Sequence, residues 1–170
     1  MEIYAYILND DNNTIAATIS TEFVPEGVEH QVLTVPFYPI DLKIDNNGNI
    51  VPDFDKTLSF VRKKHISIIS NSCQAAILSG FKSNALGSTY SYPSNVTDQI
   101  NINNAVVSGG SLWCMNDQSE WSFMQHSPEQ ASVVQKNMIT HIQSKQNRYN
   151  DLVNTINTLT SKEDIQKVEW

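Results

Sequence analysis

The titratable and nucleophilic side chains that could do chemistry are widely spaced in this chain: His65, His126, His141, Asp98 and Cys114. A nucleophile needs a base within hydrogen-bond reach, and the one pairing that suggests itself is Cys114 with His126. Two such residues flanking an apolar hairpin more often pack and bond to the backbone. We therefore predict that the protein is not an enzyme and has no catalytic residue and no cofactor.

The two cysteines, Cys73 and Cys114, each stand alone in the sequence. Neither has a second cysteine or a histidine at metal-ligand spacing, so the sequence signals neither a disulfide framework nor a zinc site. Both are predicted to be buried thiols, and no metal ligands are predicted. His65 and His141 lie on otherwise apolar helix faces, where they could approach one another in an antiparallel helix pair as hydrogen-bonded seam residues.

A polar group, Asp98, Gln99 and Asn101, opens a predicted helix. Asp98 and Asn101 are three residues apart, which places them on one helical face. From there they can hold the preceding Ser/Tyr loop by hydrogen bonds from side chain to backbone. This structural role is the preferred interpretation, and recognition of a partner's backbone is the alternative.

Four aromatic residues, Tyr90, Tyr92, Trp113 and Trp121, cluster around predicted turns. Such rings most often cap a small core while offering a polar edge, which is the preferred interpretation. The alternative is that they stack on sugar rings, which requires several of them to be exposed. His126 is interpreted as fixing the start of the long helix that follows it.

The first 52 residues predict a small antiparallel β module. Alternation in residues 3–8 and 14–19, around a turn at Asp10–Asn13, predicts a hairpin. A strand at 31–35 follows, and then a second hairpin whose Asn47-Gly48 turn favours positive backbone angles.

Residues 53–170 predict a helical domain with a two-long-helix hairpin and a short Trp-bearing β-hairpin, so the fold class is α+β. Helical periodicity runs from about 56 to 79, 95 to 107 and 128 to 158, with a short last helix after 160. Residues 83–94 are expected to be irregular or a short hairpin. Ser127-Pro128 with Gln130 is a strong helix start.

The last long helix, about 45 Å at 1.5 Å per residue, exceeds the core that a small domain needs. Its surplus face can pair with a second copy of the chain, giving a homo-oligomer, or with a helix of another protein. The predicted partner surface consists of apolar and aromatic residues of its second half and of the chain end: Tyr149, Leu152, Ile156, Leu159 and Trp170.

Composition excludes two classes of partner. The net charge is −7, and the tight basic cluster Arg62–Lys64 lies within a predicted helix, so we expect no nucleic-acid binding. No apolar run approaches the roughly 18 residues that span a bilayer, and the first residues lack the pattern of a secretory signal. We expect no membrane partner and a protein that stays in the cytoplasm in which it is made.

An ordered set of motifs spans about the last two thirds of the chain: Gly80-Phe81, Ser83-Asn84-Ala85-Leu86-Gly87, Tyr92-Pro93-Ser94, Asp98-Gln99-Ile100-Asn101, Trp113, Trp121 and His126-Ser127. In this order it resembles an uncharacterised domain family found in phage and prophage tail regions, often beside tail-fibre genes. One departure is Pro93-Ser94-Asn95, where relatives often carry an acidic turn. In layout, the β start and the Trp-terminated tail are also similar to tail-fibre assembly proteins.

The resemblance implies a phage setting with no activity attached, and with it a location in the host cytoplasm during assembly or in the virion tail. The leading hypothesis is a tail-fibre assembly factor or chaperone that acts by binding a tail-fibre or other tail protein. One alternative is a structural virion component of the tail tip, baseplate or fibre attachment. A third hypothesis, from another class, is a carbohydrate-binding receptor module.

Overall fold

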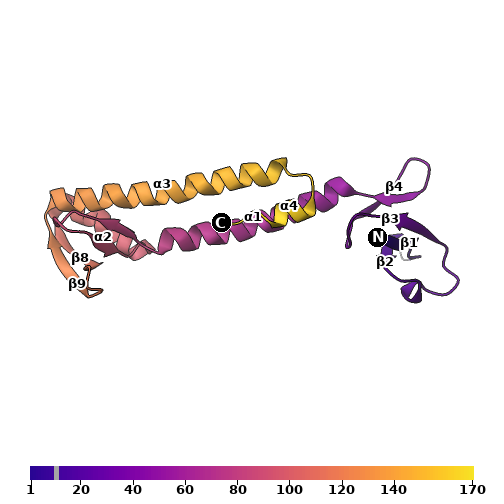
Figure 1. Cartoon of the computed structure of the whole chain (residues 1–170), viewed down its shortest axis with the longest axis horizontal. Helices are drawn as coiled ribbons and strands as arrows, with labels where there is room; N and C mark the ends of the chain where they lie inside the picture. Colours follow the sequence, from indigo (N-terminus) through magenta and orange to yellow (C-terminus); the bar gives the residue numbers. More distant parts are fainter. Residues whose placement is uncertain (10–11) are drawn as a thin grey trace. The chain divides into compact units, whose positions relative to one another are not determined.

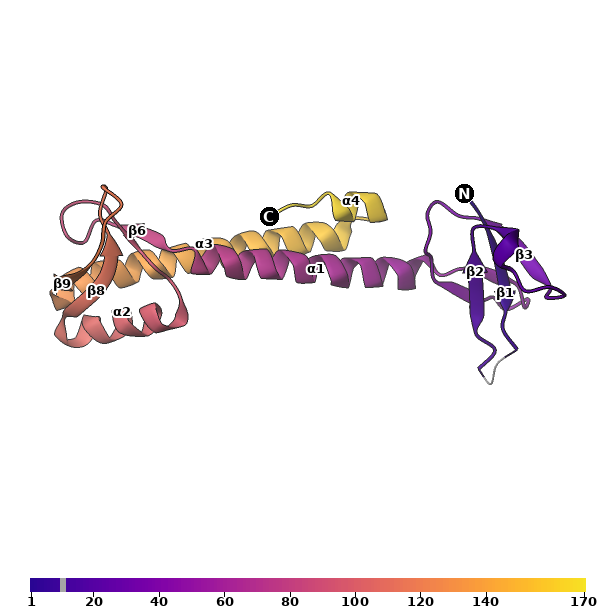
Figure 2. The same ribbon diagram turned by 90° about the horizontal axis from the view of Figure 1, so that it is seen from below.

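The computed structural model describes residues 1–9 and 12–170, which form two compact units, Met1–Lys63 and Lys64–Trp170 (Figures 1 and 2). The chain combines helices with sheets whose strands pair antiparallel, so the predicted α+β fold class is confirmed. Among the described residues, no helix combines the length and apolar character needed to cross a bilayer.

The first unit contains a three-stranded antiparallel sheet in the order β2-β1-β3 and a separate two-stranded ladder of β4 and β5. The elements are β1 (Glu2–Ile7), β2 (Ile15–Thr18), the short helix η1 (Thr21–Phe23), β3 (His30–Thr34), β4 (Leu42–Ile44) and β5 (Ile50–Pro52). Ile3, Val35 and Ile40 form its buried core. The turn expected at Asp10–Asn13 includes residues 10 and 11, which lie outside the described residues.

The helix α1 (Phe54–Leu78) begins where the sequence predicts, and Asp53 caps it by accepting a 3.2 Å bond from the Lys56 amide. The division between the two units falls inside this helix, after the limit expected at Pro52. Its first turns are tied to the strands because the buried Thr57 hydroxyl accepts from the Asp41 amide at 2.7 Å. The same hydroxyl donates to the Asp53 carbonyl at 2.9 Å.

The second unit is built on a four-stranded antiparallel sheet in the order β6-β7-β8-β9. Its other elements are helices, and in chain order after α1 the set is β6 (Phe81–Ser83), β7 (Tyr90–Tyr92), α2 (Val96–Ser108), β8 (Gly110–Met115), β9 (Trp121–His126), α3 (Pro128–Thr158) and α4 (Lys162–Gln166). The sequence predicts the β8–β9 hairpin. For residues 83–94 the sequence predicts either an irregular stretch or a short hairpin, and the structure shows the hairpin: β6 and β7 pair antiparallel and extend the same sheet.

Helix starts in this unit follow the capping residues closely. Ser127 and Gln130 form a reciprocal capping box at α3, as the sequence predicts. Asn95 caps α2 by accepting from the amides of Thr97 and Asp98 at 3.0 and 3.2 Å. These caps fix the first turn of α2, and therefore the position from which Asp98 projects.

The core of the second unit lies between the sheet and the helices α2 and α3. Its buried members come from every layer: Phe81, Tyr92, Ile102, Ala105, Leu112, Cys114, Ala131, Val134 and Met138. Helices on one face leave the opposite side chains of the β8–β9 hairpin facing outward. Both cysteines are buried free thiols, as predicted.

Within the second unit, α3 runs antiparallel to the later part of α1 (Figures 1 and 2). The Cys73 thiol donates to the Lys145 carbonyl at 3.6 Å, and the His141 ring reaches the carbonyls of Ala76 and Ile77 at 3.1 and 3.2 Å. This is the predicted two-helix hairpin. The four strands of the sheet and α2 lie between these two helices in the sequence.

Gly80 and Gly87 provide a matched test of this packing because both have positive φ, +93° and +89°. A Cβ at Gly80 would meet the Tyr92 carbonyl oxygen at 2.6 Å, whereas one at Gly87 would meet open space. We expect Gly87→Ala to cost about 1 kcal/mol for the left-handed backbone alone, and Gly80→Ala at least about 2 kcal/mol more. Urea unfolding of both variants checks this; equal losses would contradict the close approach of Gly80 to Tyr92.

Candidate functional site

The outward face of the β8–β9 hairpin carries three large aromatic side chains. Trp113 lies opposite Phe123 in the register, and Met115 lies opposite Trp121. Trp113 is 38 %, Trp121 43 % and Phe123 68 % exposed. The preferred prediction that the tryptophans cap a core is therefore wrong for these two, since they sit on the solvent side of the sheet. Trp113, Trp121 and Phe123 are called the aromatic ladder below.

The ladder is an ordered surface in which the rings support one another. Trp113 and Phe123 have ring centroids 4.7 Å apart at 53°, and Trp113 and Trp121 are stacked at 5.9 Å and 13°. Both separations lie in the range in which aromatic pairs attract. The hairpin turn adds rigidity, because the Asn116 side chain accepts from the Gln118 and Glu120 amides at 3.0 and 2.9 Å.

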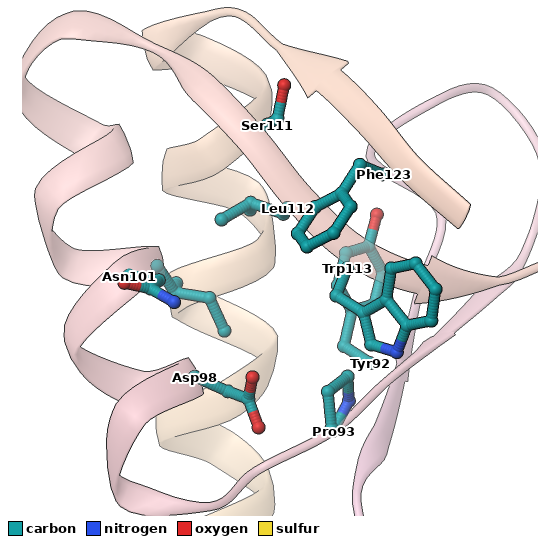
Figure 3. Close-up of a pocket in the computed structure, with 9 residues that line it drawn as sticks. Tyr92, Pro93, Asp98, Asn101, Ser111, Leu112, Trp113 and Phe123 are labelled. Carbon is teal, nitrogen blue, oxygen red and sulfur yellow. The ribbon is translucent and has the colours of Figure 1, made fainter. Parts of the chain in front are cut away.

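A pocket of about 280 Å³ lies between the aromatic ladder and α2 (Figure 3). Its lining mixes aromatic, aliphatic and polar side chains: Tyr92, Pro93, Asp98, Asn101, Ile102, Ser111, Leu112, Trp113 and Phe123. Such a mixture, with a few convergent polar groups among apolar ones, is typical of small-molecule sites. This cavity is called the hairpin pocket below.

The hairpin pocket exists because the chain leaves the sheet after β7. Strand β7 pairs with β8 at Ser91 and Met115. Two residues later Pro93, which has no amide hydrogen, cannot continue the ladder. The chain then turns away toward the Asn95 cap, so this side of β8 faces α2 across a gap.

Asp98 is the polar centre of the hairpin pocket. Its Oδ2 atom is buried and has no hydrogen-bond partner within the described residues. In Figure 3, Asp98 and Asn101 lie on the α2 side, facing Trp113 and Phe123 across the pocket. An unpaired buried acceptor costs on the order of 1 to 3 kcal/mol, so a ligand that donates to it recovers that energy on binding.

The predicted structural role of Asp98 and Asn101 is wrong, since in the described part of the chain neither side chain holds the preceding loop. Gln99 does so instead: its Nε2 donates to the Ser94 carbonyl at 2.9 Å. Asn95 supplies the remaining bonds as the cap of α2. The loop is therefore held by neighbouring residues, which leaves Asp98 and Asn101 facing the pocket.

His126, Tyr92 and Cys114 form a buried polar chain beneath the pocket. The His126 Nδ1 lies 2.7 Å from the Met124 carbonyl, which can only accept, so Nδ1 carries the proton. Nε2 then accepts from the Tyr92 hydroxyl at 2.8 Å. His126 thus fixes the end of β9 to β7 across the sheet. Tyr90, at the start of β7, is half-buried.

Burial raises the pKa of the Cys114 thiol, against a smaller opposite effect of its hydrogen bond to Tyr92. A nucleophilic cysteine needs a lowered pKa and access to solvent. The geometry therefore gives Cys114 the environment of a structural thiol, with Tyr92 between it and His126.

The predicted partner surface on the last helices needs correction. Ile156 is fully buried, as is Ile165 of α4, because the chain folds back after α3. Trp170 lies over Arg148, whose guanidinium carbon is 5.3 Å from the ring centroid. Both residues therefore have partners inside the chain. The remaining members, Tyr149, Leu152 and Leu159, are half-buried.

His65 and His141 do not meet, contrary to the approach considered from the sequence. His65 Nε2 bonds to the Val168 carbonyl at 2.8 Å, whereas His141 reaches the end of α1 at Ala76. The two sites are eleven residues apart on α1, or roughly 16 Å along the helix. Each histidine has its own backbone hydrogen-bond partner, and the bond of His65 to Val168 holds the segment that folds back after α3.

Phe123 is the site residue that the sequence interpretation missed. It stands two residues after Trp121 on a strand, so alternation alone puts both on one face. Residues 116–120 separate the paired Met115 and Trp121, and a turn of this length sets Phe123 opposite Trp113. The sequence therefore contained the signal for Phe123, namely its spacing from Trp121. The sequence did not show that Pro93 ends the pairing of β7 with β8, because that depends on where β7 leaves the sheet.

Neither a search for metal-binding clusters nor a comparison with known proteins indicates a function for this chain. Across residues 1–9 and 12–170, no three His, Cys, Asp or Glu side chains gather closely enough to hold a metal ion. Comparison of the chain with protein-family models, with curated proteins and with solved structures finds no match. Function must therefore be argued from the hairpin pocket itself.

The buried chain of Tyr92 and Cys114 predicts a loss of stability at alkaline pH. Burial raises the pKa of both groups, from 10.0 and 9.0. The unfolded chain gives up these protons first, so the stability they contribute is complete below about pH 9 and falls as the pH rises further.

We expect urea unfolding between about pH 8 and pH 10.5, under reducing conditions, to record that decline. Tyr92→Phe removes one donor to His126, which should cost about 1 to 3 kcal/mol at neutral pH, and should flatten the alkaline decline. A stability that stays constant through this range would contradict the buried arrangement.

Proposed function

We propose that this protein is a non-catalytic carbohydrate-binding module whose binding site is the hairpin pocket and the adjoining aromatic ladder. The observation that supports it most strongly is the exposed aromatic ladder, whose rings contact one another, beside a carboxylate oxygen that has no partner in the described residues. Of the three roles predicted from the sequence, the receptor module fits this site best.

The chemistry of a sugar ring matches the two halves of the pocket. A pyranose presents C–H groups on its faces, which pack against the electron-rich face of an aromatic ring. Its edges carry hydroxyl groups that need hydrogen-bond partners. Trp113 and Phe123 offer the first kind of contact, and Asp98 and Asn101 offer the second. A volume of about 280 Å³ is at the lower end for ligand pockets and suits one small ring.

Two other ligands that use aromatic stacking fit less well. Single-stranded nucleic acid needs a positive groove along its backbone, whereas the chain carries a net charge of −7 and the pocket is lined by Asp98. Hydrolysis of a glycosidic bond normally needs two carboxyl groups about 5 to 9.5 Å apart. Asp98 is the one acidic side chain among the described lining residues, which favours binding without cleavage.

The second candidate is a tail-fibre assembly factor or a structural virion component, as the resemblance implies. What favours a protein partner is a set of apolar side chains on the helices of the second unit that are about half exposed: Ile68, Leu78 and Ile139. Mass spectrometry of purified particles separates the two forms of this candidate. Stoichiometric presence supports the virion component, and absence supports the transient factor.

Carbohydrate binding is tested by screening the full chain on immobilised glycans and then measuring the affinity of Trp113→Ala and Phe123→Ala variants. Each loses a ring face at the pocket, so we expect at least about tenfold weaker binding with an unchanged circular-dichroism spectrum. Phe23→Ala is the matched control. The exposed fraction of Phe23, 70 %, is close to the 68 % of Phe123, and Phe23 belongs to η1 and does not line the pocket. Equal binding by all three variants, or no glycan bound at all, would contradict the proposal.

A further inference from the structure

We infer that Asp98 restricts the hairpin pocket to uncharged sugars with two adjacent hydroxyl groups, and that it rejects acidic sugars such as uronic and sialic acids. This inference rests on the carbohydrate function proposed above and names the class of sugar. It depends on the place of Asp98 in the pocket lining and on its Oδ2 atom, which has no hydrogen-bond partner among the described residues.

The position of Asp98 is fixed by the fold. It occupies the first turn of α2, where the Asn95 cap binds its amide at 3.2 Å. Its carboxyl group faces the pocket, and Oδ2 is buried without a partner in the described residues. A carboxylate accepts hydrogen bonds and donates none, so its complement in a ligand is a pair of donors. Two adjacent hydroxyl groups of a sugar supply that pair.

Asn101 supplies what the carboxylate lacks. It lies one turn further along α2, three residues from Asp98, and lines the same pocket. An amide side chain both donates and accepts, so it bonds a hydroxyl group of either polarity. A carboxylate, an amide and two ring faces together match a neutral pyranose better than they match a simple cation, which requires acceptors only.

The same carboxylate sets the charge preference. A ligand carboxylate within a few ångströms of Asp98 is repelled, and the repulsion is stronger where surrounding apolar side chains exclude water. Leu112, Ile102 and Trp113 line this pocket together with Asp98. No arginine or lysine lines it among the described residues, so an acidic sugar finds no compensating cation there.

The test compares sugars that differ in one group only. Methyl glucoside and methyl glucuronide share every atom of the ring and differ at carbon 6, and the galacto pair differs likewise. Binding of all four to the full chain is measured by ligand-detected NMR in low salt. We expect the better neutral sugar to bind at least about tenfold more tightly than its acidic counterpart.

Asp98→Asn is the decisive variant, because it keeps the shape and removes the charge. It should weaken binding of the neutral sugar and bring the ratio of neutral to acidic affinity close to one. Asp117→Asn is the matched control: Asp117 is exposed in the hairpin turn, outside the pocket, and its loss should leave the ratio unchanged. A purely structural Asp98 would lower stability without changing the ratio.

Each outcome decides a different claim. Equal affinity for neutral and acidic sugars in the unmodified protein overturns the inference about Asp98 and leaves carbohydrate binding standing. Binding of tetramethylammonium in the pocket with no sugar bound overturns both, since it identifies a site for cations. A neutral preference that persists in Asp98→Asn shows that another feature sets it, which also overturns the inference.

Discussion

The buried side chain of Tyr92 is the point on which the architecture of the second unit depends. Its ring stacks on Phe81 at 5.7 Å and 17°, and its hydroxyl donates to His126 at the end of β9. These contacts join the two edge strands of the sheet across β8. The chain then reaches Pro93, which cannot pair with β8, and departs toward α2. Tyr92 therefore links the edge strands of the sheet, and it lines the pocket next to Pro93.

The outward position of the aromatic ladder is a consequence of the core underneath. Leu112 and Cys114 pack inward between α2 and α3, so the strand that carries them must point Trp113 outward. The partner strand does the same with Trp121 and Phe123. Because both strands are held in register by the hairpin and by His126, the exposed rings are positioned before any ligand arrives. Preorganisation of this kind reduces the entropy lost on binding.

Local signals in the sequence predicted most of the fold. Ser127 with Gln130 marked the start of α3, helical periodicity marked α1, α2 and α3, and the short Trp-bearing hairpin was predicted where β8 and β9 pair. Pairing of β7 with β8 was not predictable in the same way, since a single bridge between Ser91 and Met115 joins segments separated by a whole helix. Non-local contacts of this kind leave no period in the sequence.

For the candidate site, too, the local features were predictable from the sequence and the non-local ones were not. The aromatic and polar residues were identifiable by type, but their exposure was not, because a tryptophan on a strand faces the core or solvent according to register. Ile156 and Trp170 were assigned to a partner surface because the return of the chain after α3 has no local signature. The fully buried Ile165 shows how far the folded-back segment belongs to the core.

The most direct test of the central claim uses the three tryptophans as reporters, since each contributes one indole N–H signal to a nitrogen-15 NMR spectrum. Trp113 and Trp121 belong to the aromatic ladder, whereas Trp170 lies over Arg148. On titration with a neutral sugar selected from the glycan screen, the indole signals of Trp113 and Trp121 should shift together in a saturable way while that of Trp170 stays in place. A saturable shift confined to Trp170, or no shift of any indole, would contradict the account.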